Sequence, residues 1–433
     1  MSFNPTKYIS LSPQSKQLIE NVISLSLVQG TNYLLPLITL PYLVRVLGPE
    51  KFGLIAFAQA FTQYFITVTD YSFIHTAPRR ISVNRGDINK LNEIFNAVML
   101  VKLGLMLACF VLAAIVIFTF ARFRGDWNLY FVSFLMVLGN VLFPVWMFQG
   151  MEKMKYITVL NLISKLFFTG SIFLAVKDTS DYLYVPLLNS LGLILSGSIA
   201  LFVVYNKLGV VFKIPSKLQL KVELKDGWHL FLGMFSVNLF SSTNLVILGL
   251  FANNTMVGYF RAGDALVRAL IGLLQPIVNA IYPHVCRLAG SSKRSAYLFI
   301  RKTLLFIAVI GFAIAIVTLI FAEPIVMTVF GKQYRETISV IMILSFLPFI
   351  SNCSSVLGVQ GLLAFNKNVT FSKIVTVSAI CNVILAFLLT PVYKHIGISV
   401  SLVTTELFTL IVVAFVTRDI FSSKYNTSRG VVG

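Results

Sequence analysis

Charged side chains are scarce in this 433-residue chain. Asp, Glu, Lys and Arg make up 12% of it, whereas 57% of the residues are hydrophobic. Soluble domains carry about 25% charged residues. Polar stretches long enough to form a soluble domain are also lacking, because the apolar runs follow one another almost without a break. The composition therefore excludes a string of soluble domains, which the length alone would suggest.

Acidic residues are fewer still. The chain has 16 Asp and Glu against 35 Lys and Arg, which gives a net charge of +19. A nucleic-acid-binding protein gathers its basic residues on a soluble face. Here the basic residues lie mostly between the apolar runs. This placement predicts contact with anionic membrane lipids and no binding to nucleic acid.

Residues suited to metal or cofactor chemistry are few and scattered. The four cysteines lack Cys-x-x-Cys spacing, and the four histidines stand at the edges of apolar runs without metal-ligand spacing. Neither a metal site nor a disulfide framework is expected. The chain also has no phosphate-binding glycine loop, so we expect no cofactor and no ATP hydrolysis.

Long apolar runs are what the chain has in abundance. A bilayer core about 30 Å thick requires roughly 20 apolar residues per helix, and only helices satisfy the backbone within a single span. The runs predict twelve transmembrane helices, the first a permanent helix rather than a signal peptide. Prolines such as Pro144 and Pro348 should bend their helices. The predicted spans are 18–43, 52–74, 93–120, 128–150, 157–176, 182–205, 228–250, 257–283, 297–321, 337–362, 371–393 and 396–417.

The spacing of the spans predicts two halves. A basic segment with five lysines, 206–227, is the longest connection and separates six spans from six. We therefore expect an N-terminal six-helix bundle (1–205), a cytoplasmic linker (206–227) and a C-terminal six-helix bundle (228–433). An even number of helices per half implies parallel repeats about an axis along the membrane normal. Gly53 and Gly258 open corresponding spans and give faint support to the repeat.

Lys and Arg also predict the orientation. With the N-terminus inside, the inside segments, taken to extend over 284–303 and 363–373 into the adjoining span ends, hold 23 Lys and Arg, and the outside loops hold eight. Cytoplasmic loops carry this kind of excess. Both termini are thus expected in the cytoplasm.

Four segments match the sequence pattern of a known family: Leu40–Gly53 (LPYLVRVLGPEKFG), Arg79–Ser82 (RRIS), Phe143–Tyr156 (FPVWMFQGMEKMKY) and Val257–Ala262 (VGYFRA). In these segments the chain resembles bacterial O-antigen flippases, in the polysaccharide exporter branch of the multidrug, lipid-linked-oligosaccharide and polysaccharide exporters. The chain departs from the family at Asp70–Phe73, where the family has a glycine-containing Tyr-Gly-Phe, and at Pro78.

The resemblance implies two six-helix bundles arranged as a V around a central cavity. It implies alternating-access transport of an oligosaccharide on undecaprenyl pyrophosphate from the inner to the outer leaflet of the bacterial inner membrane. It also implies an O-antigen polymerase and a chain-length regulator as partners. None of this follows from composition or spacing.

Three charges within the eighth span are the strongest candidates for a substrate site. Arg261, Asp264 and Arg268 share one helical face, because they are three and four residues apart. Arginine suits a pyrophosphate, since its planar fork binds two oxygens at once. Asp264 would orient the arginines. Alternatively, Arg261 lies close enough to the outer surface to reach water along its own side chain.

Three further cations complete the predicted cationic cavity. Lys165 lies near the middle of the fifth span, too deep to reach water easily. Lys102 is nearer the inner face, where extension toward water explains it equally well. Arg45 lies at the outer mouth of the first span and is either a cavity residue or an interface anchor.

Three acidic residues are candidates for ion coupling. Glu406, near the centre of the twelfth span, could exchange a proton, remain neutral or serve as a static partner for a cation. Asp70 and Glu20 lie near cytoplasmic helix ends, where capping or a solvated helix face is the simpler explanation.

Two other functions remain open at this stage. A cation or drug antiporter on the same scaffold would have an acid-rich cavity, whereas the charges within these spans are mostly basic. A membrane polymerase or glycosyltransferase would need a large external loop or a carboxylate and metal constellation. The closest acidic pair, Asp178 and Asp181, lies in a short exposed turn. We therefore expect a transporter and not an enzyme.

Overall fold

The protein is helical throughout the described part of the chain. The computed structural model describes the backbone of residues 13–426 and, except at 37, 229 and 233–242, the side chains of residues 35–418. No strand occurs within this part. The predicted all-α class is confirmed.

The helices follow one another with short connections. They are α1 (Pro13–Asp70), α2 (Phe73–Val83), α3 (Ile88–Thr119), α4 (Ala121–Arg124), α5 (Trp127–Leu142), α6 (Val145–Gly150), α7 (Met154–Ala175), η1 (Thr179–Leu183), α8 (Tyr184–Lys207), α9 (Lys217–Phe251), α10 (Asn254–Ser291), α11 (Lys293–Ile320), α12 (Ala322–Ile325), η2 (Val326–Phe330), η3 (Lys332–Tyr334), α13 (Thr337–Leu344), α14 (Leu347–Ser355), η4 (Val356–Leu362), η5 (Leu363–Phe365) and α15 (Asn368–Asn426).

Two of these helices contain a sharp break. In α1 the backbone leaves the helical region at Gly48, where φ is 67° and ψ is 172°. In α15 it does so at Lys394, where φ is 52°. Each break falls between two predicted spans. Proline has a similar effect at Pro144, which separates α5 from α6, because it cannot donate the helical hydrogen bond.

Nine helical stretches in the described part are long and apolar enough to cross a bilayer. Two of them contain a break: the stretch 38–83 is broken at Gly48, and the stretch 368–418 is broken at Lys394. The chain is therefore a multi-pass membrane protein. The count of twelve crossings stays a prediction, as does the repeat relating six helices to six. Helix α9 contains the predicted span 228–250, much of whose side-chain structure lies outside the described residues.

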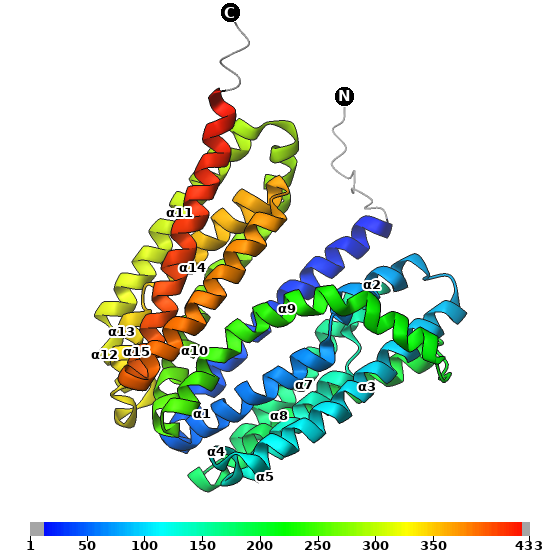
Figure 1. The fold of residues 1–433 in the computed structure, drawn as a ribbon, viewed down its shortest axis with the longest axis horizontal. Helices are drawn as coiled ribbons and strands as arrows, with labels where there is room; N and C mark the ends of the chain where they lie inside the picture. Colours follow the sequence, from blue (N-terminus) through cyan, green and yellow to red (C-terminus); the bar gives the residue numbers. More distant parts are fainter. Residues whose placement is uncertain (1–12, 427–433) are drawn as a thin grey trace, which may run out of the picture.

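The helices form two groups that diverge like the arms of a V (Figure 1). Helices α1–α8 make up one group, and α10–α15 make up the other. The groups meet at one end, where α1 packs extensively against α10. We call this the narrow end. The described start of α1 and the described end of α15 both lie toward the opposite, wide end.

Helix α9 connects the groups. It begins at Lys217, within the predicted linker, after a Ser216 cap whose hydroxyl accepts from the Gln219 N–H. Its first turns are fastened to the first group: the Tyr71 hydroxyl donates to the Leu224 carbonyl (2.7 Å), and the Ser72 hydroxyl donates to the Gly227 carbonyl (3.0 Å). Farther along, α9 also packs against α15. Residues 217–227 are thus helical and anchored rather than a loose connection.

Aromatic side chains fill the core of the first group near the narrow end. Phe57 and Phe61, one turn apart on α1, pack against Phe123 and Tyr130, with ring centroids 4.9–6.3 Å apart. All four are buried. Edge and tilted contacts of this kind add to the stabilisation from burial. This cluster holds α1, α4 and α5 together and supports the end where the two groups meet.

We predict that Gly48→Ala destabilises the protein. The φ and ψ of Gly48 lie in a region that essentially only glycine occupies, so an added Cβ should cost about 1–3 kcal/mol. Thermal unfolding in detergent would measure this cost. Gly104→Ala is the matched control, because its Cβ would meet nothing within 4 Å. Equal unfolding midpoints for the two variants would contradict the prediction.

Candidate functional site

The three predicted charges on α10 do meet. Arg268 donates from Nε to both carboxylate oxygens of Asp264, at 2.8 Å each. Arg261 donates from Nη1 to Asp264 Oδ2 at 3.2 Å. The helical spacing produces this arrangement, since residues i, i+3 and i+7 lie along one face. Asp264 is therefore clamped between two guanidinium groups.

Exposure separates the three side chains. Asp264 has 3% of its side-chain surface exposed, whereas Arg261 has 34% and Arg268 has 51%. A carboxylate this deeply buried requires partners, and the arginines supply them. Only Nε of Arg268 takes part in a hydrogen bond to another described residue. Its two terminal amino groups thus remain available to an anionic ligand.

Glu406 approaches the same cluster from another helix. It lies on the second segment of α15, and its charge interacts with that of Arg268. No hydrogen bond joins these two residues within the described structure. If Glu406 is ionised, the two arginines and two acids together carry no net charge. The site is consequently less cationic than Arg261 and Arg268 alone would make it.

Asp70 and Lys102 form a second buried pair. The Lys102 ammonium lies 2.9 Å from Asp70 Oδ1 and joins the end of α1 to α3. Lys102 has 3% of its side chain exposed, and Asp70 has 38%. Lys102 therefore does not extend to water. Its charge is already matched by Asp70, and this pairing also gives Asp70 a structural role.

The other predicted residues lie apart from α10. Lys165 is partly exposed on α7. Arg45 lies at the narrow end, where it binds the backbone of η2 in the second group. The side chain of Glu20 lies outside the described residues. The structure thus joins Arg261, Asp264 and Arg268 in one cluster, on which the charge of Glu406 also acts, and Asp70 with Lys102 in another.

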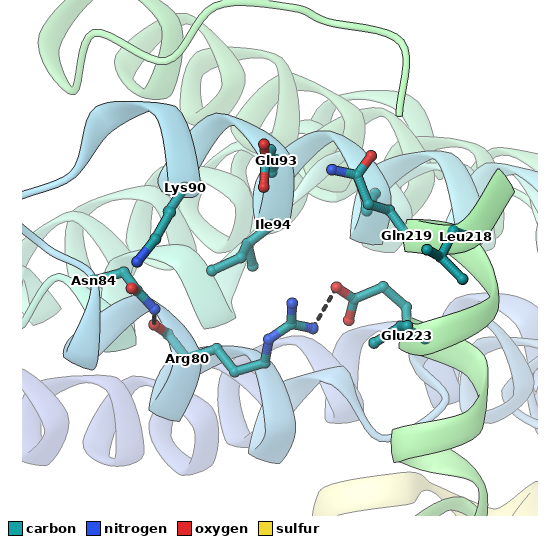
Figure 2. A pocket seen from close by; sticks show the side chains of 10 residues that line it. Arg80, Asn84, Lys90, Glu93, Ile94, Leu218, Gln219 and Glu223 are labelled. Atoms are coloured by element: carbon teal, nitrogen blue, oxygen red, sulfur yellow. Dashed lines mark hydrogen bonds and ion pairs between the residues drawn. The ribbon is translucent and has the colours of Figure 1, made fainter. Parts of the chain in front are cut away.

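A third charged cluster was missed by the sequence analysis. Near the wide end, Arg80 forms an ion pair with Glu223, and Arg85 forms one with Glu152 at 2.7 Å. A cavity of about 290 Å³ lies beside the first pair, between α2, α3 and α9 (Figure 2). It is lined by Arg80, Asn84, Lys90, Glu93, Ile94, Ala97, Leu218, Gln219, Val222 and Glu223. The segment 206–227 contains five lysines and a single glutamate, Glu223, and its sequence carries no signal that pairs this glutamate with Arg80.

Burial controls the ionisation of Glu223. Its side chain is 4% exposed, and this desolvation raises the pKa of its carboxyl, while Arg80 opposes the rise. Glu152 shows the opposite effect, because hydrogen bonding and attraction from Arg85 lower its pKa. Glu223 thus depends on Arg80 for its charged form. Within the described residues, no three His, Cys, Asp or Glu side chains are grouped as a metal site would require.

This fold and these internal charge pairs define a class, the polytopic α-helical membrane proteins with charged groups in their interior. A family model described as "Polysaccharide biosynthesis protein" matches residues 18–289. A protein of Escherichia coli (strain K12) described as an O-antigen transporter is 36% identical over 405 residues, covering 92% of this chain and 96% of the relative. A Shigella dysenteriae protein with the same description is 31% identical, covering 89% and 96%. The chain belongs to the polysaccharide biosynthesis protein family, which confirms the expected resemblance.

Solved structures of transporters share the fold. An inward-facing multidrug resistance MATE family transporter of the MOP superfamily matches with a TM-score of 0.71 at 15% identity, covering 94% of this chain and 99% of that one. The lipid II flippase MurJ in an inward closed conformation also matches with 0.71, at 14% identity, covering 92% and 87%. At such low identity the likeness establishes the architecture alone.

We predict that Arg80→Ala destabilises the protein by about 1–3 kcal/mol at neutral pH, because it leaves a buried carboxylate without its partner. The pKa of Glu223 should then rise further. The deficit should shrink as the pH falls through that pKa, since the protonated carboxyl is easier to bury. Thermal unfolding across pH would measure this.

Two variants sharpen the test of this pair. Glu223→Gln placed in the Arg80→Ala background should restore much of the stability, because it removes the charge. Arg79→Ala is the control, since Arg79 is the exposed neighbour of Arg80. A deficit that stays constant with pH and persists in the double variant would show that Glu223 is not its cause.

Proposed function

We propose that this chain is a flippase that moves an undecaprenyl-pyrophosphate-linked O-antigen oligosaccharide from the cytoplasmic to the periplasmic leaflet. Family membership and relatives described as O-antigen transporters support this. The fold shared with the MATE transporter and with MurJ is compatible with it. The substrate would pass between the two helix groups by alternating access, without ATP hydrolysis.

The observation that carries the proposal is the half-exposed Arg268 held by the buried Asp264. A diphosphate crossing a bilayer must exchange water for other partners, because an unpaired charge in the membrane is costly. The Arg268 fork can provide them through its terminal amino groups. Asp264 fixes the guanidinium in advance, so less side-chain entropy is lost when the anion binds.

The charge balance at this site explains how a substrate could leave again. Asp264, together with Glu406 in its ionised form, compensates Arg261 and Arg268. An arriving diphosphate therefore competes with these acids instead of meeting an uncompensated cation. Transport requires binding that is reversible, and this competition limits the affinity. Lys165, on α7 in the opposite group, would supply a second contact.

The distribution of basic residues supports an orientation in the membrane. Helix α2, which carries Arg79 and Arg80, and the lysine-rich segment 206–227 lie toward the wide end of the V (Figure 1). If this end faces the cytoplasm, as the positive-inside rule favours, the described conformation is ready to receive substrate from the inner leaflet. Both termini would then be cytoplasmic, in the bacterial inner membrane, and anionic lipids would contact the basic surface.

A cation or drug antiporter is the second candidate on this scaffold. It would need interior carboxylates able to accept a cation. Asp264 is held by two arginines, and Asp70 is held by Lys102. Both acids are thus already neutralised by the protein's own cations, which favours an anionic substrate. An O-antigen polymerase and a chain-length regulator would act on the exported unit.

We predict that Arg268→Ala and Lys165→Ala each abolish export of the surface glycan without preventing membrane insertion. Each variant removes a cation that would compensate the diphosphate. Glycan at the cell surface would be measured in a strain lacking the native gene, with protein in the membrane quantified in parallel. Arg294→Ala, an exposed arginine in the first turn of α11, is the control. Normal export by both Arg268→Ala and Lys165→Ala would refute the proposed cationic site.

Glu406 is the candidate for coupling transport to the proton gradient, because it is partly buried on α15 and its charge interacts with that of Arg268. Protonation would release Arg268 from this acid and strengthen its hold on the diphosphate. We expect Glu406→Gln to lose most of the stimulation that a pH gradient gives to flipping in proteoliposomes. Full export by Glu406→Gln under a collapsed pH gradient, together with an unchanged response to the gradient, would exclude this role.

A further inference from the structure

We propose that the narrow end is a gate. The side chains of Arg45 and Arg122, which we call the clasps, hold it closed, and helices α1 and α10 cross in close contact there at Gly53 and Gly258. The inference rests on the proposed transport function, which requires the narrow end to open. It assigns Arg45 a role in holding the two groups together instead of in binding substrate.

Arg45 binds the carbonyl end of a helix in the other group. Its Nε donates to the Val329 carbonyl at 3.0 Å, and its Nη2 donates to the Thr328 carbonyl. Helix η2 ends here because Gly331, with φ at 92°, turns the chain away. The last carbonyls of a helix lack partners within it and carry partial negative charge, which a guanidinium can satisfy. Gln333 adds a bond in the reverse sense, from Nε2 to the Arg45 carbonyl at 3.1 Å.

Arg122 makes a similar contact from α4. It donates from Nε to the Gly249 carbonyl, in the last turn of α9, at 2.9 Å. It also donates from Nη2 to Asn254 Oδ1, at the start of α10, at 2.5 Å. Its guanidinium carbon lies 5.2 Å from the centre of the Phe57 ring, which holds the side chain in place. Two arginines of the first group thus bind neutral oxygens at helix ends beyond it.

Two glycines let the helices touch backbone to backbone. A Cβ at Gly53 would lie 1.8 Å from the Asn254 carbonyl oxygen, and one at Gly258 would lie 2.0 Å from the Pro49 carbonyl oxygen. Neither helix could accept a side chain here without moving away from the other. The two helices can therefore cross at this distance only when both residues are glycine.

All these acceptors are uncharged, and this suits a gate that must open repeatedly. A carboxylate in the same place would bind the arginines more tightly. The contacts with carbonyl and amide oxygens are individually modest. Arg45 is exposed and Arg122 is partly exposed even with these contacts made, so water can replace the lost oxygen partners when the contacts break. The closed state is thus held by several weak hydrogen bonds and by the close packing at Gly53 and Gly258, which a larger side chain would disrupt.

A buried reporter beside the clasps can test the gate. Leu47 is 2% exposed and lies between Arg45 and the break at Gly48. In a background with the four native cysteines replaced, Leu47→Cys would be labelled with a charged methanethiosulfonate reagent on protein in nanodiscs, which leave both faces accessible. We expect Arg45→Ala, Arg122→Ala and Gly53→Ala each to raise the labelling rate at least threefold.

Matched controls distinguish the gate from general loosening. Arg124→Ala should leave labelling unchanged, because Arg124 binds the Phe118 carbonyl within its own group. Gly104→Ala should also have no effect, since its Cβ would meet nothing within 4 Å. Spin labels at the exposed positions Glu50 and Lys332 give a second readout, in which the clasp variants should show a new population at longer distance.

The proposal is overturned if the clasp variants and their controls label at equal rates and the distance distribution stays unchanged. If a clasp variant unfolds, as judged by its melting midpoint, Arg45→Lys is tested instead. This substitution keeps the charge but loses the planar fork of the guanidinium. It should still label faster than its control, Arg124→Lys. Labelling requires no lipid substrate. Loss of the proposed flipping activity and failure of the gate are therefore recorded by separate experiments.

Discussion

A charge inside a bilayer must have a partner, and this requirement organises the interior of the protein. An unmatched ion at the centre of a span costs about 3 kcal/mol or more. The structure meets the requirement twice by pairing: Asp264 with Arg261 and Arg268, and Asp70 with Lys102. In the first arrangement Asp264 is almost fully buried and the two arginines are partly exposed; in the second Lys102 is almost fully buried and Asp70 is partly exposed. Each arrangement therefore presents charge of one sign beyond the packed core.

The two pairs have opposite consequences. On α10 the exposed members are arginines, so the cluster offers cationic donors to a ligand. Between α1 and α3 the exposed member is Asp70, and the cation is hidden. An anionic substrate fits the first arrangement and not the second. The asymmetry between the helix groups is the electrostatic basis of the proposed substrate site.

A different kind of bond holds the two groups together. At the narrow end, guanidinium groups bind uncharged oxygens, and glycines permit the closest backbone approach. Permanent charge pairs stay within a group on α10 and between α1 and α3, whereas the weaker bonds cross between the groups. This division fits a protein whose helix groups stay intact while the contact between them opens and closes.

The sequence by itself determined the all-α membrane fold, because lipid forces each long apolar run into a helix. It also determined the Arg261, Asp264 and Arg268 cluster, since helical spacing alone brings these residues together. Only the tertiary structure decided the partners of Lys102, Arg45 and Glu223, which lie 32, 283–284 and 143 residues away in the chain. Such pairings depend on how each helix is rotated and tilted against its neighbours. A hydrophobic pattern does not encode this, because lipid accepts an apolar helix in any rotation.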